Sequence, residues 1–153
     1  MDVTNYDFES KLEQGFKSLF NTAGINLYIA DDVDGELPDE NVRLELSVGG
    51  AISNEHLTAG NYDNYGGSID INIQTPRVSG DQVAIGEGQF ASRHAELVAI
   101  ARKTMEEIPA AVLTANWPNA LSPTKITPTG TERDNDAESR STTLSYSLQF
   151  RIT

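Results

Sequence analysis

The chain has 153 residues, a formal net charge of −12 and no cysteine. A chain of this length can bury a core of its own, so we expect residues 1–153 to form a single domain. The lack of cysteine excludes disulfides, thiolate catalysis and cysteine-ligated zinc or iron–sulfur centres. No apolar stretch reaches the roughly 20 residues that span a bilayer, and no basic leader opens the chain, so we expect no membrane contact and no signal-peptide export.

The first predicted element is an amphipathic helix. Gly24 follows it, at a position where a left-handed residue commonly ends a helix. The apolar side chains of this predicted helix recur every three or four residues and share one face: Phe8, Leu12, Phe16, Leu19 and Phe20.

Three strands are predicted next, over residues 25–30, 42–48 and 69–73. The second and third alternate apolar and polar side chains, which is typical of a sheet with one buried face and one wet face. A second helix is predicted over residues 89–108, with Phe90 and His94 on its apolar stripe and Pro109 after its end.

A long connection follows the second helix, with at most a short strand at residues 125–127, because prolines interrupt it. The chain closes with a strongly alternating strand over residues 143–152. The order of elements predicts an α+β fold, with two helices packed on one face of a mainly antiparallel sheet of four to five strands. Long loops are expected at about 49–67 and 109–140, and loops of that length are commonly functional or disordered.

Residues 31–40 carry six acidic side chains and no basic one. Asp32, Asp34 and Gly35 resemble part of a calcium-binding loop, but the glycine comes too early and Arg43 stands at the twelfth position. A solvated acidic turn between two strands is the better interpretation.

Residues 86–91 resemble a dinucleotide-binding fingerprint through Gly86, Gly88 and Ala91. Such a fingerprint needs an acidic residue at the end of a second strand, whereas Glu106 and Glu107 belong to the same predicted helix. We therefore interpret these glycines as a flexible lead-in to the helix and expect no cofactor.

His56 and His94 are the two histidines of the chain. His94 lies on the apolar stripe of its helix, so we expect it to be a packed side chain rather than a metal ligand or a catalytic base. No Gly-x-Ser-x-Gly motif is present and no acidic neighbour orients either histidine. We expect neither a metal site nor an enzyme.

The loop over residues 57–67 places tyrosines among glycine, asparagine and aspartate. Such a loop is suited to recognition, and Tyr62, Asp63 and Tyr65 are candidates for a subunit contact. An equally good interpretation is a long turn whose tyrosines fold back on the sheet. Residues 129–140 predict a mobile polar loop that leads into the final strand and that either has no role or becomes ordered on assembly.

Several stretches together resemble the tail terminator and tail completion proteins of long-tailed bacteriophages. An opening helix begins at YDFESKL, a strand ends in VGGA, an aromatic and glycine-rich loop leads to GSIDINIQTPR, and a helix runs from HAELV to ARKTM. A late acidic loop then precedes a long terminal strand.

This resemblance implies an α+β protein of the virion tail or neck, assembled in the cytoplasm of the bacterial host. Such proteins form a hexameric ring that caps the tail tube, stops its polymerisation and contacts the head-side connector while DNA passes through. An acidic bore would repel the DNA backbone. From composition, Asp31, Asp32, Asp34 and Glu36 are candidates for a loop that faces the bore or the next ring.

Two alternatives remain. A tail tube or head–tail connector subunit would need extended hairpins, and the chain offers one long insertion at residues 49–67. A small-ligand or metal-binding α+β domain would use the acidic segment or the glycines at residues 86–91.

Overall fold

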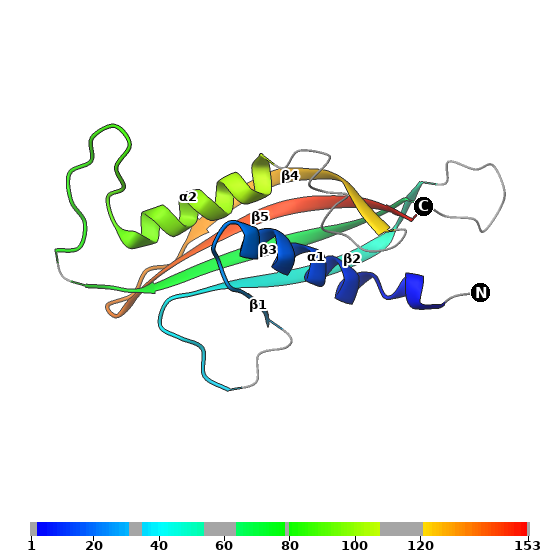
Figure 1. Cartoon of the computed structure of the whole chain (residues 1–153), viewed down its shortest axis with the longest axis horizontal. Helices are drawn as coiled ribbons and strands as arrows, with labels where there is room; N and C mark the ends of the chain where they lie inside the picture. Colours follow the sequence, from blue (N-terminus) through cyan, green and yellow to red (C-terminus); the bar gives the residue numbers. More distant parts are fainter. Residues whose placement is uncertain (1–2, 31–34, 54–63, 79, 108–120, 153) are drawn as a thin grey trace.

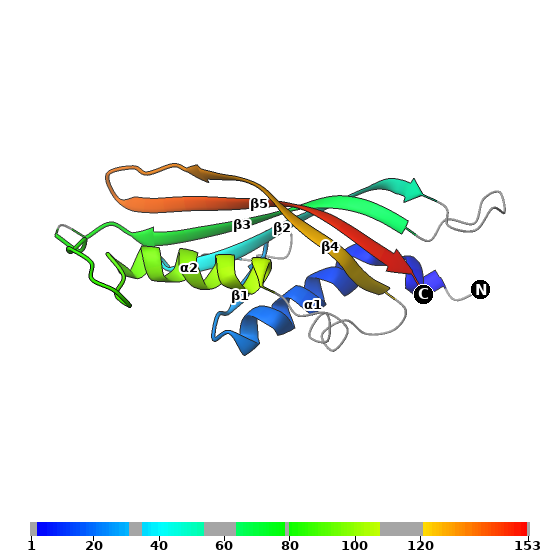
Figure 2. The same cartoon turned by 90° about the horizontal axis from the view of Figure 1, so that it is seen from above.

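The computed structural model describes residues 3–30, 35–53, 64–78, 80–107 and 121–152. These residues form a five-stranded sheet with both helices on one face, as Figures 1 and 2 show, and this confirms the predicted α+β fold. The elements in chain order are a 3₁₀ turn (Val3–Tyr6), α1 (Phe8–Thr22), β1 (Leu27–Ile29), β2 (Asn41–Ser53), β3 (Asn64–Pro76), α2 (Arg93–Glu106), β4 (Leu121–Arg133) and β5 (Ser139–Ile152). Neither described helix is long and apolar enough to cross a membrane.

The strand order in the sheet is β1-β2-β3-β5-β4, with β1 parallel to β2 and every other pair antiparallel. Val42 lies opposite Ile73, and Ile71 lies opposite both Leu44 and Leu144. This register places the apolar residues of β2, β3 and β5 on the same face. The helices cover that face, and their apolar stripes join the strands in one hydrophobic cluster.

Helix α2 is shorter than the predicted element. The Ser92 hydroxyl accepts a hydrogen bond from the Ala95 amide, so the helix begins at Arg93 rather than at residue 89. Phe90 therefore lies outside the helix, and 48% of its surface is exposed instead of lying on the buried stripe.

The bounds predicted for the two long loops, residues 49–67 and 109–140, are wrong because strands occupy part of each range. Strand β2 runs to Ser53 and β3 begins at Asn64, while β4 occupies much of the second predicted loop. The polar segment 129–140 is strand up to Arg133, followed by a short turn in which the Asp136 carboxylate accepts hydrogen bonds from the Glu138 and Ser139 amides.

The prolines of β4 explain why the sequence pattern predicts at most a short strand here. Strand β4 lies at the edge of the sheet and has a neighbouring strand on one side only. Proline has no backbone N–H to donate, and an edge strand tolerates it because the backbone groups on its outer side pair with no strand. Its register with β5 shifts between Pro123 and Lys125 and again between Pro128 and Gly130, as bulges do at sheet edges.

Gly67 is required by close approach of two strands. A Cβ there would lie 2.5 Å from the Ser47 carbonyl oxygen and 3.3 Å from the Val48 Cα, both backbone atoms.

We predict that Gly67→Ala lowers the free energy of unfolding by about 1–3 kcal/mol, measured by urea denaturation. Gly130→Ala, where a Cβ would meet nothing within 4 Å, is the matched strand control and should change stability little. Equal effects of the two substitutions would contradict this packing.

Candidate functional site

The core-facing side of the sheet becomes polar at one end. Arg140 and Thr142 continue the alternation of Leu144 along β5, and Thr75 continues that of Ile73 along β3. All three polar residues are buried because they share the face that the helices cover. Buried polar groups need partners, so this end of the core has to supply them.

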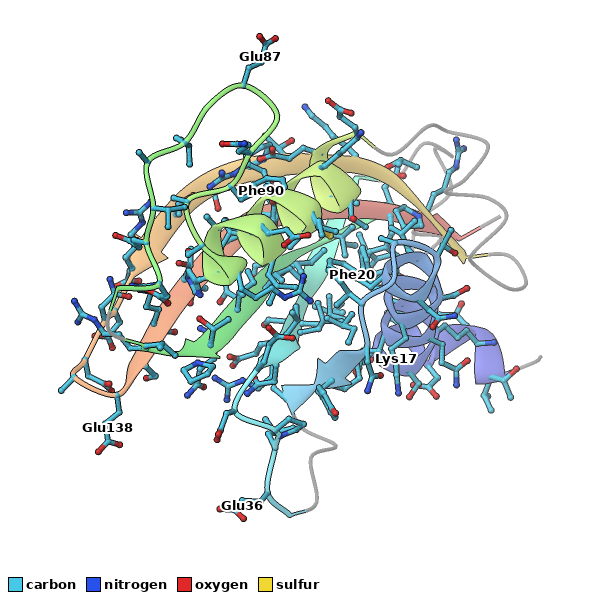
Figure 3. All side chains as sticks on the ribbon, turned by 60° about the vertical axis from the view of Figure 1, so that its left-hand side comes forward. Lys17, Phe20, Glu36, Glu87, Phe90 and Glu138 are labelled. Atoms are coloured by element: carbon cyan, nitrogen blue, oxygen red, sulfur yellow. The ribbon has the colours of Figure 1, made fainter. Side chains whose placement is uncertain are left out.

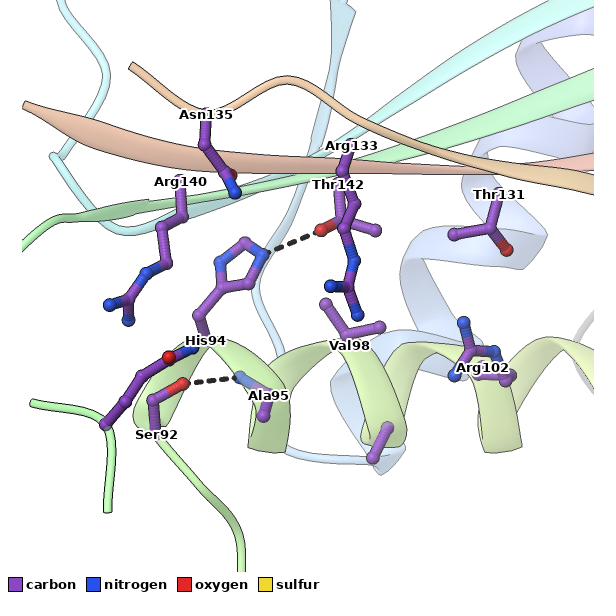
Figure 4. A pocket seen from close by; sticks show the side chains of 12 residues that line it. Ser92, His94, Ala95, Val98, Arg102, Thr131, Arg133, Asn135, Arg140 and Thr142 are labelled. Atoms are coloured by element: carbon purple, nitrogen blue, oxygen red, sulfur yellow. Dashed lines mark hydrogen bonds between the residues drawn. The ribbon is translucent and has the colours of Figure 1, made fainter. Parts of the chain in front are cut away.

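His94 of α2 supplies one set of partners. Its Nδ1 lies 2.9 Å from the Thr75 hydroxyl oxygen and its Nε2 lies 2.8 Å from the Thr142 hydroxyl oxygen, the second contact being drawn in Figure 4. Burial disfavours the charged imidazolium, and the nearby Arg140 and Arg133 repel it, so the pKa of His94 lies below its ordinary value. The expectation of a packed histidine is confirmed.

Asp81 supplies the partner of Arg140. The guanidinium donates two hydrogen bonds to the Asp81 carboxylate, at 2.6 and 2.7 Å, in a bidentate ion pair. The hydrogen bond from Arg140 lowers the pKa of Asp81, and this outweighs the opposing effect of burial. The pair ties the connection between β3 and α2 to the first residues of β5.

That connection, residues 77–92, is called the arm here. It is held at its base by a hydrogen bond from the Arg77 amide to the Glu138 carbonyl oxygen, and further out by one from the Val83 amide to the Ala91 carbonyl oxygen. Glu87 marks its outer end in Figure 3. Large apolar side chains are 48–61% exposed along it: Val78, Val83, Ile85 and Phe90.

A pocket of about 200 Å³ lies between α2 and the hairpin of β4 and β5, next to His94. Within the described part of the chain, no acidic side chain lines it. Figure 4 shows Arg133 pointing from the strand side toward α2, and Arg102 pointing from α2 toward the strands. This space, called the arginine pocket here, is defined by Arg102, Arg133 and Arg140 with Gln82, Ser92, Thr131 and Asn135.

The chemistry of the arginine pocket favours binding of an anion. Guanidinium groups from two sides form forked hydrogen bonds with carboxylate or phosphate oxygens. Among the described residues no group of three side chains is placed to hold a metal ion, and both ring nitrogens of His94 are engaged by threonines. Sequence reasoning missed this site. The available signal was Arg140, which keeps the phase of the apolar residues of β5 and so had to face inward.

The predicted site residues are only partly described. Asp31, Asp32, Asp34, Tyr62 and Asp63 lie outside the described residues, as does His56. Glu36 is exposed in the connection between β1 and β2.

Tyr65 lies in β3, not in a loop. Its ring stacks on Phe150 with centroids 5.6 Å apart and lies 4.8 Å from the ring of Phe8. This ring therefore folds back on its own sheet, which was one of the two interpretations. The role of Tyr65 in a subunit contact stays a prediction.

The glycines at residues 86–91 lie in the arm. Gly88 has a φ of +76° in a turn, and the described residues just before it form no strand. The strand that a dinucleotide fingerprint requires is missing from this stretch.

Comparisons with known proteins identify the fold alone. No family model matches the chain, and no curated protein matches its sequence. A solved structure matches this chain over 99% of its length and over 94% of the other chain, with a TM-score of 0.50 and 20% sequence identity. At that identity the likeness supports a shared architecture and no function.

The buried histidine gives the folded state a pH dependence. The unfolded chain binds a proton at His94 near pH 6.5, whereas the folded chain binds it only at lower pH. We predict that the free energy of unfolding falls as the pH drops below about 6.5, by at most about 1.4 kcal/mol per pH unit, until the folded pKa is reached. His94→Gln should remove this component in urea denaturation across pH 5 to 8. Parallel pH profiles of the two proteins would contradict the assignment.

The Asp81–Arg140 pair should control the order of the arm. We predict that Asp81→Asn speeds amide hydrogen exchange in residues 82–91 by roughly five- to tenfold, because it weakens the bidentate contact. Glu87→Gln removes the same charge from the tip of the arm and is the matched control, with no change expected. Equal exchange in the two variants would show that the ion pair does not anchor the arm.

Proposed function

We propose that this protein is a structural component of a bacteriophage tail. In this proposal it is a tail terminator, which forms a hexameric ring on the tail tube, stops tube polymerisation and joins the tube to the head-side connector. The support is the resemblance in element order, together with a fold that has one sheet and two helices on one of its faces. The proposal places the protein in the tail or neck of the virion, after assembly in the host cytoplasm.

The observation that carries the proposal is that the two edges of the sheet are unlike. Strand β1 pairs only with Val42–Leu44 of β2, and beyond Leu44 the described residues place no strand on that side of β2. The opposite edge is the proline-containing β4. Contacts between unlike surfaces join copies head to tail, and such contacts close into a ring when the rotation permits.

The open face of the sheet gives the proposal a second support. Figure 2 shows both described helices on the other face, so neither of them covers this one. It carries a polar network in which Asn72 accepts a hydrogen bond from Arg43 and donates to Ser141 and Thr143. A polar surface of this kind suits either solvent or a partner ring.

Charge bears on the passage of DNA. A net charge of −12 keeps the phosphate backbone from adhering, so DNA can slide through a ring without sequence preference. We propose no catalytic activity and no resident cofactor, because the pocket chemistry described above fits anion binding rather than acid–base or metal chemistry.

Electron microscopy of the full chain with its tail-tube subunit tests this function. We predict six-fold rings at the ends of tubes, and tubes that are shorter than those polymerised without the protein. Long tubes decorated along their length would instead indicate a tube or connector subunit. Unchanged tubes without rings would contradict the proposal.

A further inference from the structure

The arginine pocket stands out against the charge of the whole chain. Lysine and arginine total 11 against 23 acidic residues, and three of the 11 line this one pocket. Arg140 is paired with Asp81. Arg102 and Arg133 are exposed, and neither has an ion-pair partner among the described residues. Two guanidinium groups therefore face a space that no acidic side chain of the described fold fills.

The acidic counterpart is the connection between β1 and β2, whose described acidic residues do not line the arginine pocket. The connection between β1 and β2 includes the acidic residues 31–40, of which Glu40 is bound by Arg93 of the same molecule at 3.0 Å. Glu36 and Asp39 are exposed, and in the described residues no basic side chain binds either. Figure 3 shows Glu36 projecting away from α2, on the side of the molecule opposite to Glu87 of the arm.

The fold keeps these two sites apart within one molecule. Asp39 lines a separate surface hollow, together with the ends of β3 and β5 and the turn before β5, and that hollow shares no lining residue with the arginine pocket. Helix α2 also stands between them, because Arg93 faces the acidic side while His94 faces the pocket. A contact between the pocket and the connection therefore needs a second copy of the chain.

We infer that the arginine pocket binds the acidic connection of a second copy of this chain, with Glu36 and Asp39 as the carboxylates that meet Arg102 and Arg133. This inference rests on the proposed ring and names the contact that closes it. A pocket of about 200 Å³ has room for a carboxylate side chain, since a water molecule takes roughly 30 Å³. In the proposed ring this contact is heterologous, since the pocket of each copy takes the connection of the next copy.

Charge alone would not hold this contact. An exposed ion pair contributes only about 0–1 kcal/mol, and copies of a −12 chain repel each other. The arm adjoins the pocket through Gln82, and its exposed Val83, Ile85 and Phe90 provide apolar area to bury at the same contact. The arginines then select the partner surface and its orientation, while the arm adds affinity.

Charge reversal tests the contact. One variant carries Arg102→Glu with Arg133→Glu, and the other carries Glu36→Arg with Asp39→Arg. We expect each variant alone to need at least about tenfold more protein for half-maximal ring formation on tail tubes. An equimolar mixture of the two should restore assembly, because in alternating rings every pocket meets a connection of opposite charge. Restoration also shows that both variants fold.

The matched control carries Lys103→Glu with Lys125→Glu. These lysines lie on the same two elements, α2 and β4, are exposed and do not line the pocket. The control should form rings as the unchanged chain does. Intact rings from the Arg102/Arg133 variant, or a mixture that fails to assemble, would overturn this inference and leave the proposed function standing. If the unchanged chain forms no ring on tubes, the proposed function fails and the inference fails with it.

Discussion

The central strands of this sheet carry apolar side chains on one face only, and two helices have to cover that face. The register of β2, β3 and β5 aligns their alternating patterns, so that residues such as Leu44, Ile71 and Leu144 lie side by side. Helices α1 and α2 pack against the resulting surface in one cluster. The positions of the arm, the pocket and the two sheet edges all follow from where these helices begin and end.

The polar end of the core is a consequence of the same alternation. Along β5 the inward phase continues from Leu144 to Thr142 and Arg140, so two polar side chains enter the region that α2 covers. His94 and Asp81 satisfy them. Because these partners come from the start of α2 and from the arm, the polar end of the core holds the helix start and the arm in place. A charged pocket lies where the apolar packing stops.

The fold class and the packed His94 could be predicted from the sequence because hydrophobic periodicity directly reports which face is buried. Strand β4 could not, since its prolines and polar residues resemble a loop and its strand conformation comes from pairing with β5. The arginine pocket could not either. Arg102 lies some 30 residues before Arg133 and Arg140, and only the hairpin of β4 and β5 brings those two beside α2.

In the proposed ring, basic groups of one copy meet acidic groups of the next. Copies of this protein, in this proposal, join head to tail into a ring through unlike sides of the sheet. Electron cryomicroscopy of rings bound to tail tubes tests it most directly. The account predicts six copies, each with its α2 and β4 side against the β1 and β2 side of the next. A two-fold arrangement of like sides, or copies that bind the tube without touching one another, would contradict it.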